Sequence, residues 1–308
     1  MDYICISLDK NFTMKKWMLV LIAILSVVGV KAQDPKYIAA VNQWHADRIQ
    51  ELKAPDGWLN LEGLFWLHKG KNTFGNHKNA DCHYTHPNFP AELGSFIYEG
   101  DSVLWQNGAS KTIYINKQAT APLKTYKVFD ASEKAARMDY SQFSWVVIKR
   151  EDKVGIRFRN LKAKTLLQFK GIQRFPVQSE WKLKAKLVQP EQNFLMITNI
   201  IGQTTASKNA GKLVFEKEGI THSLDVIDEG GPNLFIVFAD QTSGVSTYGA
   251  GRFIEIPKPD SLGNTEIDFN NAYNPPCAFT AFATCPLPPK QNRLALKIEA
   301  GEKNYGHH

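Results

Sequence analysis

The sequence predicts a mainly β protein, in which a β-sandwich is followed by a second, barrel-like β unit and one amphipathic helix precedes both. Apolar residues recur at helical spacing in a single stretch, near the start of the mature part of the 308-residue chain. From residue 57 onward, short apolar or alternating segments are separated by turn residues, as in sandwiches and barrels. The stretch 268–302 contains five prolines and cannot be a helix, yet it is too apolar for a solvated linker.

Residues 1–32 are expected to comprise an upstream extension, residues 1–13, and a secretory signal peptide from Met14 to Ala32. Lys15 and Lys16 give this peptide a charged start, an apolar run follows, and the small residues before position 33 suit cleavage after Ala32. The apolar run is shorter than the roughly 20 residues that a transmembrane helix needs. We therefore expect a secreted or periplasmic protein with no integral membrane segment after cleavage. A retained anchor, and a translation start at Met1 or Met14, stay open.

An amphipathic helix is predicted within residues 33–56, at the start of the mature chain. The periodic stretch begins at Pro35, and the turn residues Pro55, Asp56 and Gly57 stop it. Its apolar residues recur at roughly helical spacing and would share one face: Ile38, Val41, Trp44, Ile49 and Leu52.

Residues 57–162 are predicted to form the β-sandwich. Val154, Ile156 and Phe158 alternate with smaller or charged residues, which is typical of a half-buried strand. The other segments expected as strands are residues 58–67, 95–98, 103–105, 112–115, 125–129 and 143–149.

The segment LFWLHKGKNTFG, a turn at Gln106-Asn107-Gly108 and the paired strands up to Phe158 give this half a recognisable layout. The layout resembles forkhead-associated β-sandwiches, a family that binds phosphothreonine. Phe74-Gly75-Asn76 lacks the arginine that the family has after its glycine, and no Ser-Arg pair with a trailing histidine follows. Phosphopeptide binding is therefore not expected.

Four histidines cluster in the same half, at His68, His77, His83 and His86, with Cys82 beside them. A Cys-His-x-x-His spacing can bind zinc, but the segment lacks a second pair of strong ligands. We therefore expect no metal site. The sequence also lacks a phosphate loop, so no cofactor is predicted.

Residues 163–308 are predicted to form the second β unit. Residues 181–187, WKLKAKL, place Lys182, Lys184 and Lys186 on one exposed face, and a turn is expected at Gly211. Residues 234–238 form a continuous apolar run, as expected for a strand covered on both faces. The net charge is only +7, and an exposed sheet face explains these lysines, so no nucleic-acid partner is expected. A polyanionic cell-envelope ligand is the alternative.

The stretch 268–302 must be pinned against the rest of the fold. The prolines of Asn274-Pro275-Pro276 impose an extended or turned backbone. After the last proline, Leu294, Leu296 and Ile298 share one face, which predicts a half-buried strand over residues 293–299. This strand would end at Gly301, so the Glu302 carboxylate could face a cleft.

Cys277 and Cys285 flank the apolar segment AFTAFAT within this stretch. Thiols can remain paired outside the cytosol, so these two are predicted to form a structural disulfide that stabilises the fold by roughly 2–3 kcal/mol. Cys82 would then be the unpaired cysteine. A redox-active pair or a nucleophilic Cys277 is the alternative, and either would need a base or a positive field nearby.

The stretch from Asp268 to Glu302 resembles the C-terminal signature of a bacterial family known only as domain of unknown function 1684. The resemblance extends through FADQTSGVSTYGAGRF, residues 238–253, back to about Trp58. No activity is established for this family, so the resemblance implies no reaction. It does single out seven further positions: Asp240, Thr242, Ser243, Gly244, Thr247, Tyr248 and Arg252.

These residues suggest three functions. In the first, a small molecule or glycan binds at a pocket mouth, with Phe279 among the apolar contacts. The residues predicted to bind it are Tyr248, Arg252, Asn270, Tyr273 and Asn274. In the second, the protein is an envelope hydrolase in which Asp240, Asp268 or Glu302 serves as acid or base. In the third, the stretch is a structural plug without a ligand. Whether the protein is an enzyme, and its oligomeric state, stay open.

Overall fold

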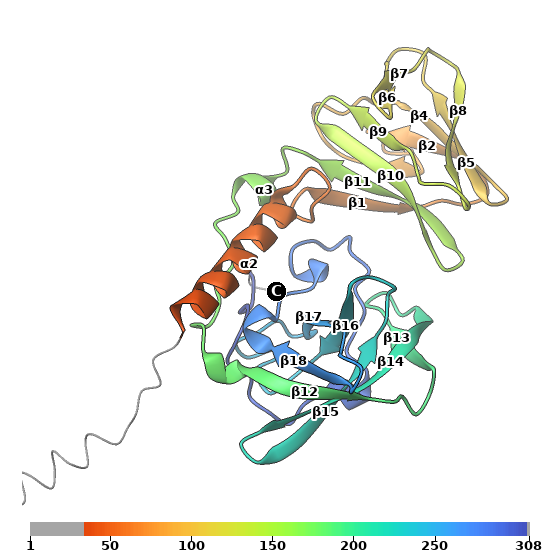
Figure 1. The fold of residues 1–308 in the computed structure, drawn as a ribbon. Helices are drawn as coiled ribbons and strands as arrows, with labels where there is room; N and C mark the ends of the chain where they lie inside the picture. Colours follow the sequence, from red (N-terminus) through yellow and green to blue (C-terminus); the bar gives the residue numbers. More distant parts are fainter. Residues whose placement is uncertain (1–33, 307–308) are drawn as a thin grey trace, which may run out of the picture.

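A computed structural model describes residues 34–306. The predicted signal peptide, Met14 to Ala32, lies outside the described residues. Two β lobes lie side by side, and one long helix, α2 (Pro35–Lys53), runs along the second of them (Figure 1). Asp34 caps this helix, because its Oδ1 accepts a hydrogen bond of 2.9 Å from the backbone N–H of Lys36.

The first lobe, residues 58–163, is a β-sandwich and is called the sandwich lobe. One sheet has the strand order β1-β11-β10-β9-β6-β7, and the other has the order β3-β2-β4-β5-β8. The strands are β1 (Leu61–Trp66), β2 (Gly70–Gly75), β3 (Cys82–His83), β4 (Gly94–Glu99), β5 (Ser102–Asn107), β6 (Tyr114–Ile115), β7 (Gln118–Ala119), β8 (Thr125–Asp130), β9 (Arg137–Tyr140), β10 (Phe143–Arg150) and β11 (Lys153–Asn160).

Aromatic side chains from both sheets fill the sandwich. Phe74 lies at the centre, with its ring 5.3 Å from that of Trp145 and 5.5 Å from that of Phe96. Trp105 and Phe158 are also fully buried against it. Large rings bury much apolar area each, so this cluster supplies most of the lobe's cohesion.

The second lobe, residues 164–306, is called the barrel lobe. Its main sheet has the order β17-β16-β15-β14-β12-β18 and is nearly closed, because Thr265 Oγ1 on β18 donates to the Pro257 carbonyl at the end of β17, 2.9 Å away. Its strands are β12 (Lys182–Val188), β13 (Phe194–Thr198), β14 (Thr204–Lys217), β15 (Ile220–Ile227), β16 (Asn233–Phe238), β17 (Arg252–Pro257) and β18 (Asn264–Asp268). Its helices are α3 (Lys164–Leu167), η1 (Ser179–Trp181), η2 (Phe269–Asn271), η3 (Pro276–Ala278) and η4 (Lys290–Asn292).

Two local predictions in this lobe have different outcomes. Lys182, Lys184 and Lys186 are exposed on β12, which confirms the predicted lysine face. The turn predicted at Gly211 is wrong. Gly211 lies within β14 at a β-bulge, with φ of +141°, and this left-handed conformation suits glycine.

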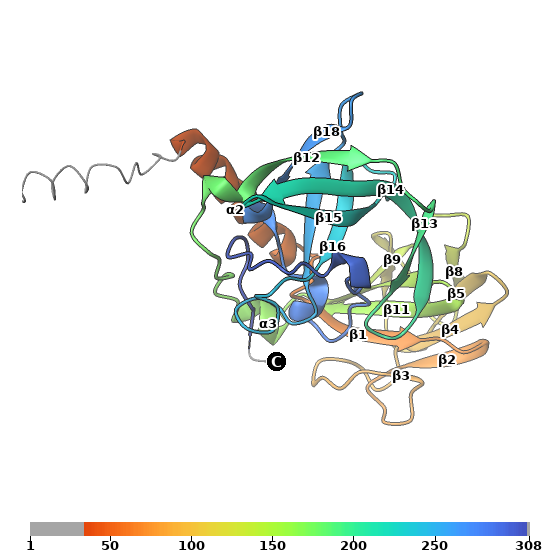
Figure 2. The ribbon, with the colours of Figure 1, turned by 90° about the horizontal axis from the view of Figure 1, so that it is seen from below.

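The strand predicted over residues 293–299 is also wrong, although Leu294 and Ile298 are buried as the alternation requires. The segment follows residues 239–241 through single backbone bonds, such as Leu294 N to the Ala239 carbonyl at 2.8 Å. Its later carbonyls face a buried arginine side chain and not a neighbouring strand. Seen from below, the described part of the C-terminal segment passes close to the residues that follow α3 (Figure 2), where the Tyr305 ring is 5.8 Å from that of Phe169.

Asn292 joins two strands whose own ladder is short. Strands β15 and β16 share one residue pair, Ile227 with Phe235. Beyond it, the Asn292 amide accepts from Asp225 N at 2.7 Å and donates to the carbonyls of Asp225 and Val237, both at 2.9 Å. One side chain of the C-terminal segment thus completes this part of the sheet.

Candidate functional site

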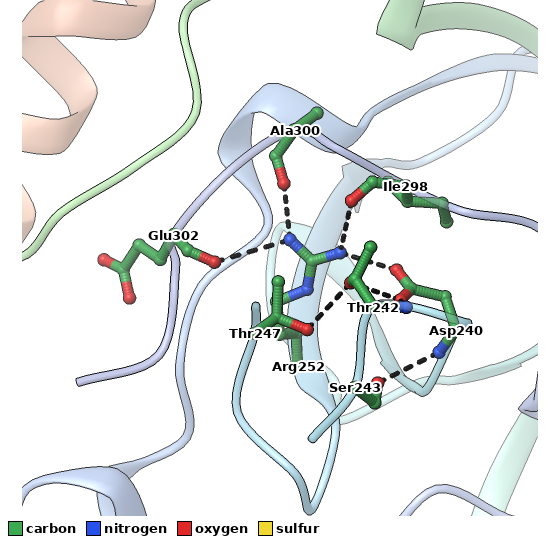
Figure 3. A network of polar contacts seen from close by, with 8 residues as sticks. All are labelled: Asp240, Thr242, Ser243, Thr247, Arg252, Ile298, Ala300 and Glu302. Atoms are coloured by element: carbon green, nitrogen blue, oxygen red, sulfur yellow. Dashed lines mark hydrogen bonds and ion pairs between the residues drawn. The ribbon is translucent and has the colours of Figure 1, made fainter. Parts of the chain in front are cut away.

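Arg252, the first residue of β17, points into the barrel lobe, and only 1% of its surface is exposed. Its Nη2 donates to Asp240 Oδ2 at 2.6 Å and to the Ile298 carbonyl at 3.1 Å (Figure 3). Its Nη1 donates to the carbonyls of Ala300 and Glu302. The guanidinium therefore holds three backbone carbonyls of the C-terminal segment and one carboxylate.

The carboxylate partner is held by the turn that follows β16. Asp240 Oδ1 accepts from the backbone N–H of Thr242 at 2.6 Å and from its hydroxyl. The Thr242 hydroxyl also contacts that of Thr247, with the two oxygens 2.8 Å apart, and Ser243 Oγ accepts from Asp240 N at 3.1 Å. Burial lowers the pKa of Arg252, and the adjacent Asp240 opposes this effect. The Asp240–Arg252 pair is thus a buried internal ion pair, in which both terminal guanidinium nitrogens are hydrogen-bonded and Nε has no partner among the described residues.

Glu302 is also buried, with 1% of its surface exposed. Its Oε1 accepts from Arg48 Nε on α2 at 2.8 Å, and its Oε2 accepts from the backbone N–H of Asn274 at 2.7 Å. Burial raises the pKa of Glu302, while Arg48 acts to lower it. Arg48 Nη2 donates to the Asn274 carbonyl at 2.8 Å, so α2 is anchored to the C-terminal segment by a charged pair.

A second anchor lies near the start of α2. The Tyr37 hydroxyl lies 2.9 and 2.8 Å from the two oxygens of Asp268. Asn270 Nδ2 donates to the Tyr37 hydroxyl and to the Gln178 carbonyl, both at 2.8 Å. Burial, followed by the hydrogen bond to Asp268, raises the pKa of Tyr37. Asp268 and Asn270 therefore also bind groups of the protein itself.

The residues predicted to bind a ligand are not brought to one opening. Arg252, Asn270 and Asn274 are buried, and Asn274 Nδ2 donates to the Lys303 carbonyl at 2.8 Å. Tyr248 is half-buried in an apolar cluster that also contains Phe279. Of the predicted ligand residues, Tyr273 lines an open cleft.

This cleft lies between α2 and the barrel lobe and is called the α2 cleft. Its volume is about 470 Å³, within the range of small-molecule sites. The lining residues come from α2, β16, β17, η2 and the segment after η2: Trp44, Asp47, Arg48, Glu51, Asn233, Glu255, Ile256, Pro257, Asn271 and Tyr273.

Aromatic rings and hydrogen-bonding groups meet in the α2 cleft. The rings of Trp44 and Tyr273 are 6.1 Å apart, and the Arg48 guanidinium lies 4.3 Å from the centre of the Tyr273 ring. Glu255 Oε1 accepts from the Tyr273 hydroxyl at 3.4 Å, and Asn233 Nδ2 donates to Glu255 Oε2 at 3.0 Å. Burial and then Glu255 raise the pKa of Tyr273, so this tyrosine stays a neutral donor.

The contribution of α2 to the cleft was missed in the sequence. Positions 44, 47, 48 and 51 follow the spacing i, i+3, i+4, i+7, so they share one helix face. This spacing was the available signal, but Trp44 was assigned to the apolar face alone. Glu255 is exposed between Ile254 and Ile256, which are buried, as expected in a strand with one solvated face.

Cys277 and Cys285 lie side by side as free thiols, so the predicted disulfide is not formed in the structure. Cys277 N donates to Cys285 Sγ at 3.1 Å, and Cys285 N donates to Cys277 Sγ at 3.4 Å. The sulfurs thus accept backbone N–H groups in place of a covalent bond. Cys82 is a third free thiol, buried in the sandwich lobe.

Fold and site together define a class: a two-lobed, mainly β protein in which a helix and a buried C-terminal segment enclose a polar cleft. Residues 167–303 match the sequence profile of a family described as a protein of unknown function (DUF1684). The match confirms the resemblance drawn from the C-terminal stretch. It begins at residue 167, so it covers the barrel lobe and does not extend to Trp58.

Two solved structures also show similarity to the chain. An uncharacterized protein of Haloarcula marismortui, determined by solution NMR, is 29% identical, with 46% of this chain and 80% of that chain covered and a TM-score of 0.38. Rad53 residues 1–466 in complex with AMP-PNP is 12% identical, with 65% of this chain and 46% of that chain covered and a TM-score of 0.18. These TM-scores are too low to support an argument about fold or function. No curated protein matches the chain.

Within the described residues, no helix has both the length and the apolar character needed to cross a membrane.

Proposed function

We propose that the protein binds a small polyhydroxylated ligand of neutral or positive charge, such as a sugar, in the α2 cleft. The observation that carries this proposal is the meeting of the tilted rings of Trp44 and Tyr273 with carboxylate and amide groups in one open cleft. Sugars present an apolar ring face and a rim of hydroxyl groups. Aromatic rings can pack against the apolar ring face, and carboxylates and amides can form hydrogen bonds with the hydroxyl groups.

The charge of the cleft favours this ligand class over anionic ones. Asp47, Glu51 and Glu255 place three carboxylates on its wall. Among the described residues that line the cleft, Arg48 is the one cation, and it is already paired with Glu302. An anionic ligand would meet uncompensated like charge, whereas hydroxyl or ammonium groups would find acceptors.

An unpartnered acceptor supports a hydrogen-bonded ligand. Asn271 lines the cleft, and its Oδ1 is buried without a hydrogen-bond partner among the described residues. A buried polar atom without a partner costs free energy, so a donor brought by a ligand would be favoured there.

The hydrolase alternative gains no support from the three candidate carboxylates. Asp240, Asp268 and Glu302 each accept hydrogen bonds from protein donors that hold the fold together. A general acid or base must reach the substrate, and Asp240 and Glu302 are buried.

Calorimetric titration with a sugar panel tests the proposal. The panel contains glucose and N-acetylglucosamine as neutral sugars, glucosamine as a cationic sugar and glucuronate as an anionic one. Trp44→Ala should weaken binding of the best neutral or cationic sugar by at least about tenfold, the loss of an aromatic anchor. Trp66→Ala is the matched control, because Trp66 is another half-buried tryptophan and lies on β1, outside the cleft. Equal effects of both substitutions, or binding of glucuronate alone, would contradict the proposal.

We also propose that the protein is exported, on the basis of the sequence pattern from Met14 to Ala32. The test is N-terminal sequencing of the protein from cell fractions. The proposal requires a mature protein that begins at Gln33 outside the cytoplasm.

A further inference from the structure

Cys277 and Cys285 are joined by reciprocal hydrogen bonds that cysteines with a purely structural role do not need. Each sulfur accepts the backbone N–H of the other cysteine, at 3.1 and 3.4 Å. This reciprocal arrangement holds the sulfurs next to one another. It also places a backbone N–H donor on each sulfur, and such donors favour a thiolate, while the Cys277 thiol can in addition donate to the Ala283 carbonyl at 3.6 Å.

The two thiols differ in access and acidity. Cys277 is half-buried, whereas 6% of Cys285 is exposed. The pKa of Cys277 is lowered, because the Cys285 thiol donates to the Cys277 thiolate, while that hydrogen bond and burial raise the pKa of Cys285. The less buried cysteine is therefore also the one that forms its thiolate more readily.

A positive charge from the sandwich lobe acts on the pair. Arg157 on β11 lies 4.9 Å over the Trp58 ring, and its charge acts on Cys285. The Nε atom of Arg157 is buried without a hydrogen-bond partner among the described residues. This cation can compensate negative charge on sulfur, and it comes from the other lobe.

We propose that Cys277 and Cys285 form a redox-active dithiol that reduces small-molecule disulfides, with Cys277 as the attacking group and Cys285 as the resolving group. The substrate must be small, because the sulfurs lie below the surface. This site is separate from the α2 cleft and does not depend on the function proposed for it.

The reaction has two balanced exchange steps. The Cys277 thiolate attacks one sulfur of the substrate R–S–S–R, the substrate S–S bond breaks as the mixed disulfide Cys277–S–S–R forms, and R–S⁻ leaves and takes up a proton. The Cys285 thiol then loses its proton and attacks the Cys277 sulfur, which forms the Cys277–Cys285 bond and releases the second RSH. Two electrons pass from the protein dithiol to the substrate disulfide.

Oxidised glutathione is the probe, applied to the folded full chain. After acid quenching and alkylation, mass spectrometry should find Cys277 and Cys285 bridged and Cys82 still a thiol. Cys82 is the internal control, because burial raises its pKa to about 12. A pair that stays fully alkylatable while the chain is folded, or that becomes bridged only in denaturant, would overturn the proposal.

Two single variants separate the roles of the sulfurs. Cys285→Ser should accumulate one glutathione on Cys277, because the resolving thiol is missing. Cys277→Ser should remain unmodified at Cys285 over the same period. Glutathione on Cys285 and not on Cys277 would overturn the assignment of the attacking sulfur. Near-UV circular dichroism verifies folding, and if a variant does not fold, the wild-type experiment still decides whether the pair is redox-active.

Discussion

Arg252 and Asp240 show how single residues close the barrel lobe. The guanidinium binds the carbonyls of Ile298, Ala300 and Glu302, and the carboxylate balances its charge. Gly301 lies between two of these carbonyls with φ of +76°, a conformation that favours glycine. The last part of the C-terminal segment, from Ile298 to Glu302, therefore binds the Arg252 side chain through carbonyls that strand pairing would otherwise use.

Loss of this side chain should destabilise the protein severely. Arg252→Ala leaves the buried Asp240 carboxylate without its countercharge, so the free energy of unfolding should fall by about 3–5 kcal/mol. Denaturant unfolding followed by circular dichroism measures this loss. Lys182→Ala is the control, because its ion pair with Glu266 lies at the surface and should contribute little. A loss in Arg252→Ala no larger than in this control would show that the internal pair does not hold the lobe together.

Residue types could be predicted at this scale, but their surroundings could not. The family resemblance singled out Asp240, Thr242 and Arg252, which the structure joins in one polar cluster, and also Tyr248, which lies in an apolar cluster. Polar residues in a turn nevertheless suggest an open site as readily as a buried one. The carbonyls that bury Arg252 lie 46 to 50 residues further along the chain, and no local pattern encodes that contact.

Helix α2 is the element on which the α2 cleft depends. It supplies one wall, and it is held by Arg48 at Glu302 and by Tyr37 at Asp268. His45 lies between these anchors, with Nδ1 3.9 Å from Glu302 Oε1. Burial, followed by the charge of Arg174, lowers the pKa of His45.

The packing of α2 should therefore weaken in acid. In the interval between the lowered pKa of folded His45 and its ordinary value of about 6.5, the unfolded state binds more protons, so stability rises with pH. This contribution of His45 to the free energy of unfolding is lost as the pH falls through this interval. Urea unfolding at about pH 5.5 and about pH 7.5 should show a smaller pH dependence in His45→Gln than in the wild type.

His68→Gln is the matched control for this prediction, because the His68 ring is exposed in the sandwich lobe. The Lys69 carbonyl raises the pKa of His68, the opposite direction to His45. An unchanged pH dependence in His45→Gln would contradict the assignment to α2.

At the scale of elements, hydrophobic periodicity predicted where helices and strands form better than it predicted what each of them packs against. The amphipathic helix and the lysine face of β12 were predicted from spacing alone. The strand predicted over residues 293–299 is not formed, although its alternating burial was correct. The carbonyls of Ile298 and Ala300 bind the Arg252 side chain and not a neighbouring strand. Alternation reports which side chains are buried, whereas a strand also needs a neighbouring backbone.

On the scale of the whole molecule, the two lobes meet at the segment that carries the thiols. Thr280 Oγ1 donates to the Leu61 carbonyl of β1 at 2.9 Å, and Arg157 of β11 faces Cys285. The sandwich lobe has its own aromatic core and the barrel lobe its own cluster. The mainly β class and the order of the units were therefore predictable from separate hydrophobic patterns.

The site could be predicted only in part. Tyr273 was identified from its place among the prolines of the C-terminal stretch, but the opposite wall comes from a helix more than 200 residues earlier. Contacts over such distances arise from the packing of finished elements. The sequence predicts the helix that forms this wall, but it does not indicate which part of the protein packs against that helix.

Fluorine NMR of the protein labelled with 5-fluorotryptophan tests the central claim, that the α2 cleft is the ligand site, most directly. The resonance of Trp44, assigned with Trp44→Phe, should shift during titration with the sugar that binds most tightly in calorimetry. The resonances of Trp66, Trp105 and Trp145 in the sandwich lobe should stay in place. A saturating sugar that shifts one of these resonances, and leaves Trp44 unmoved, would contradict the account.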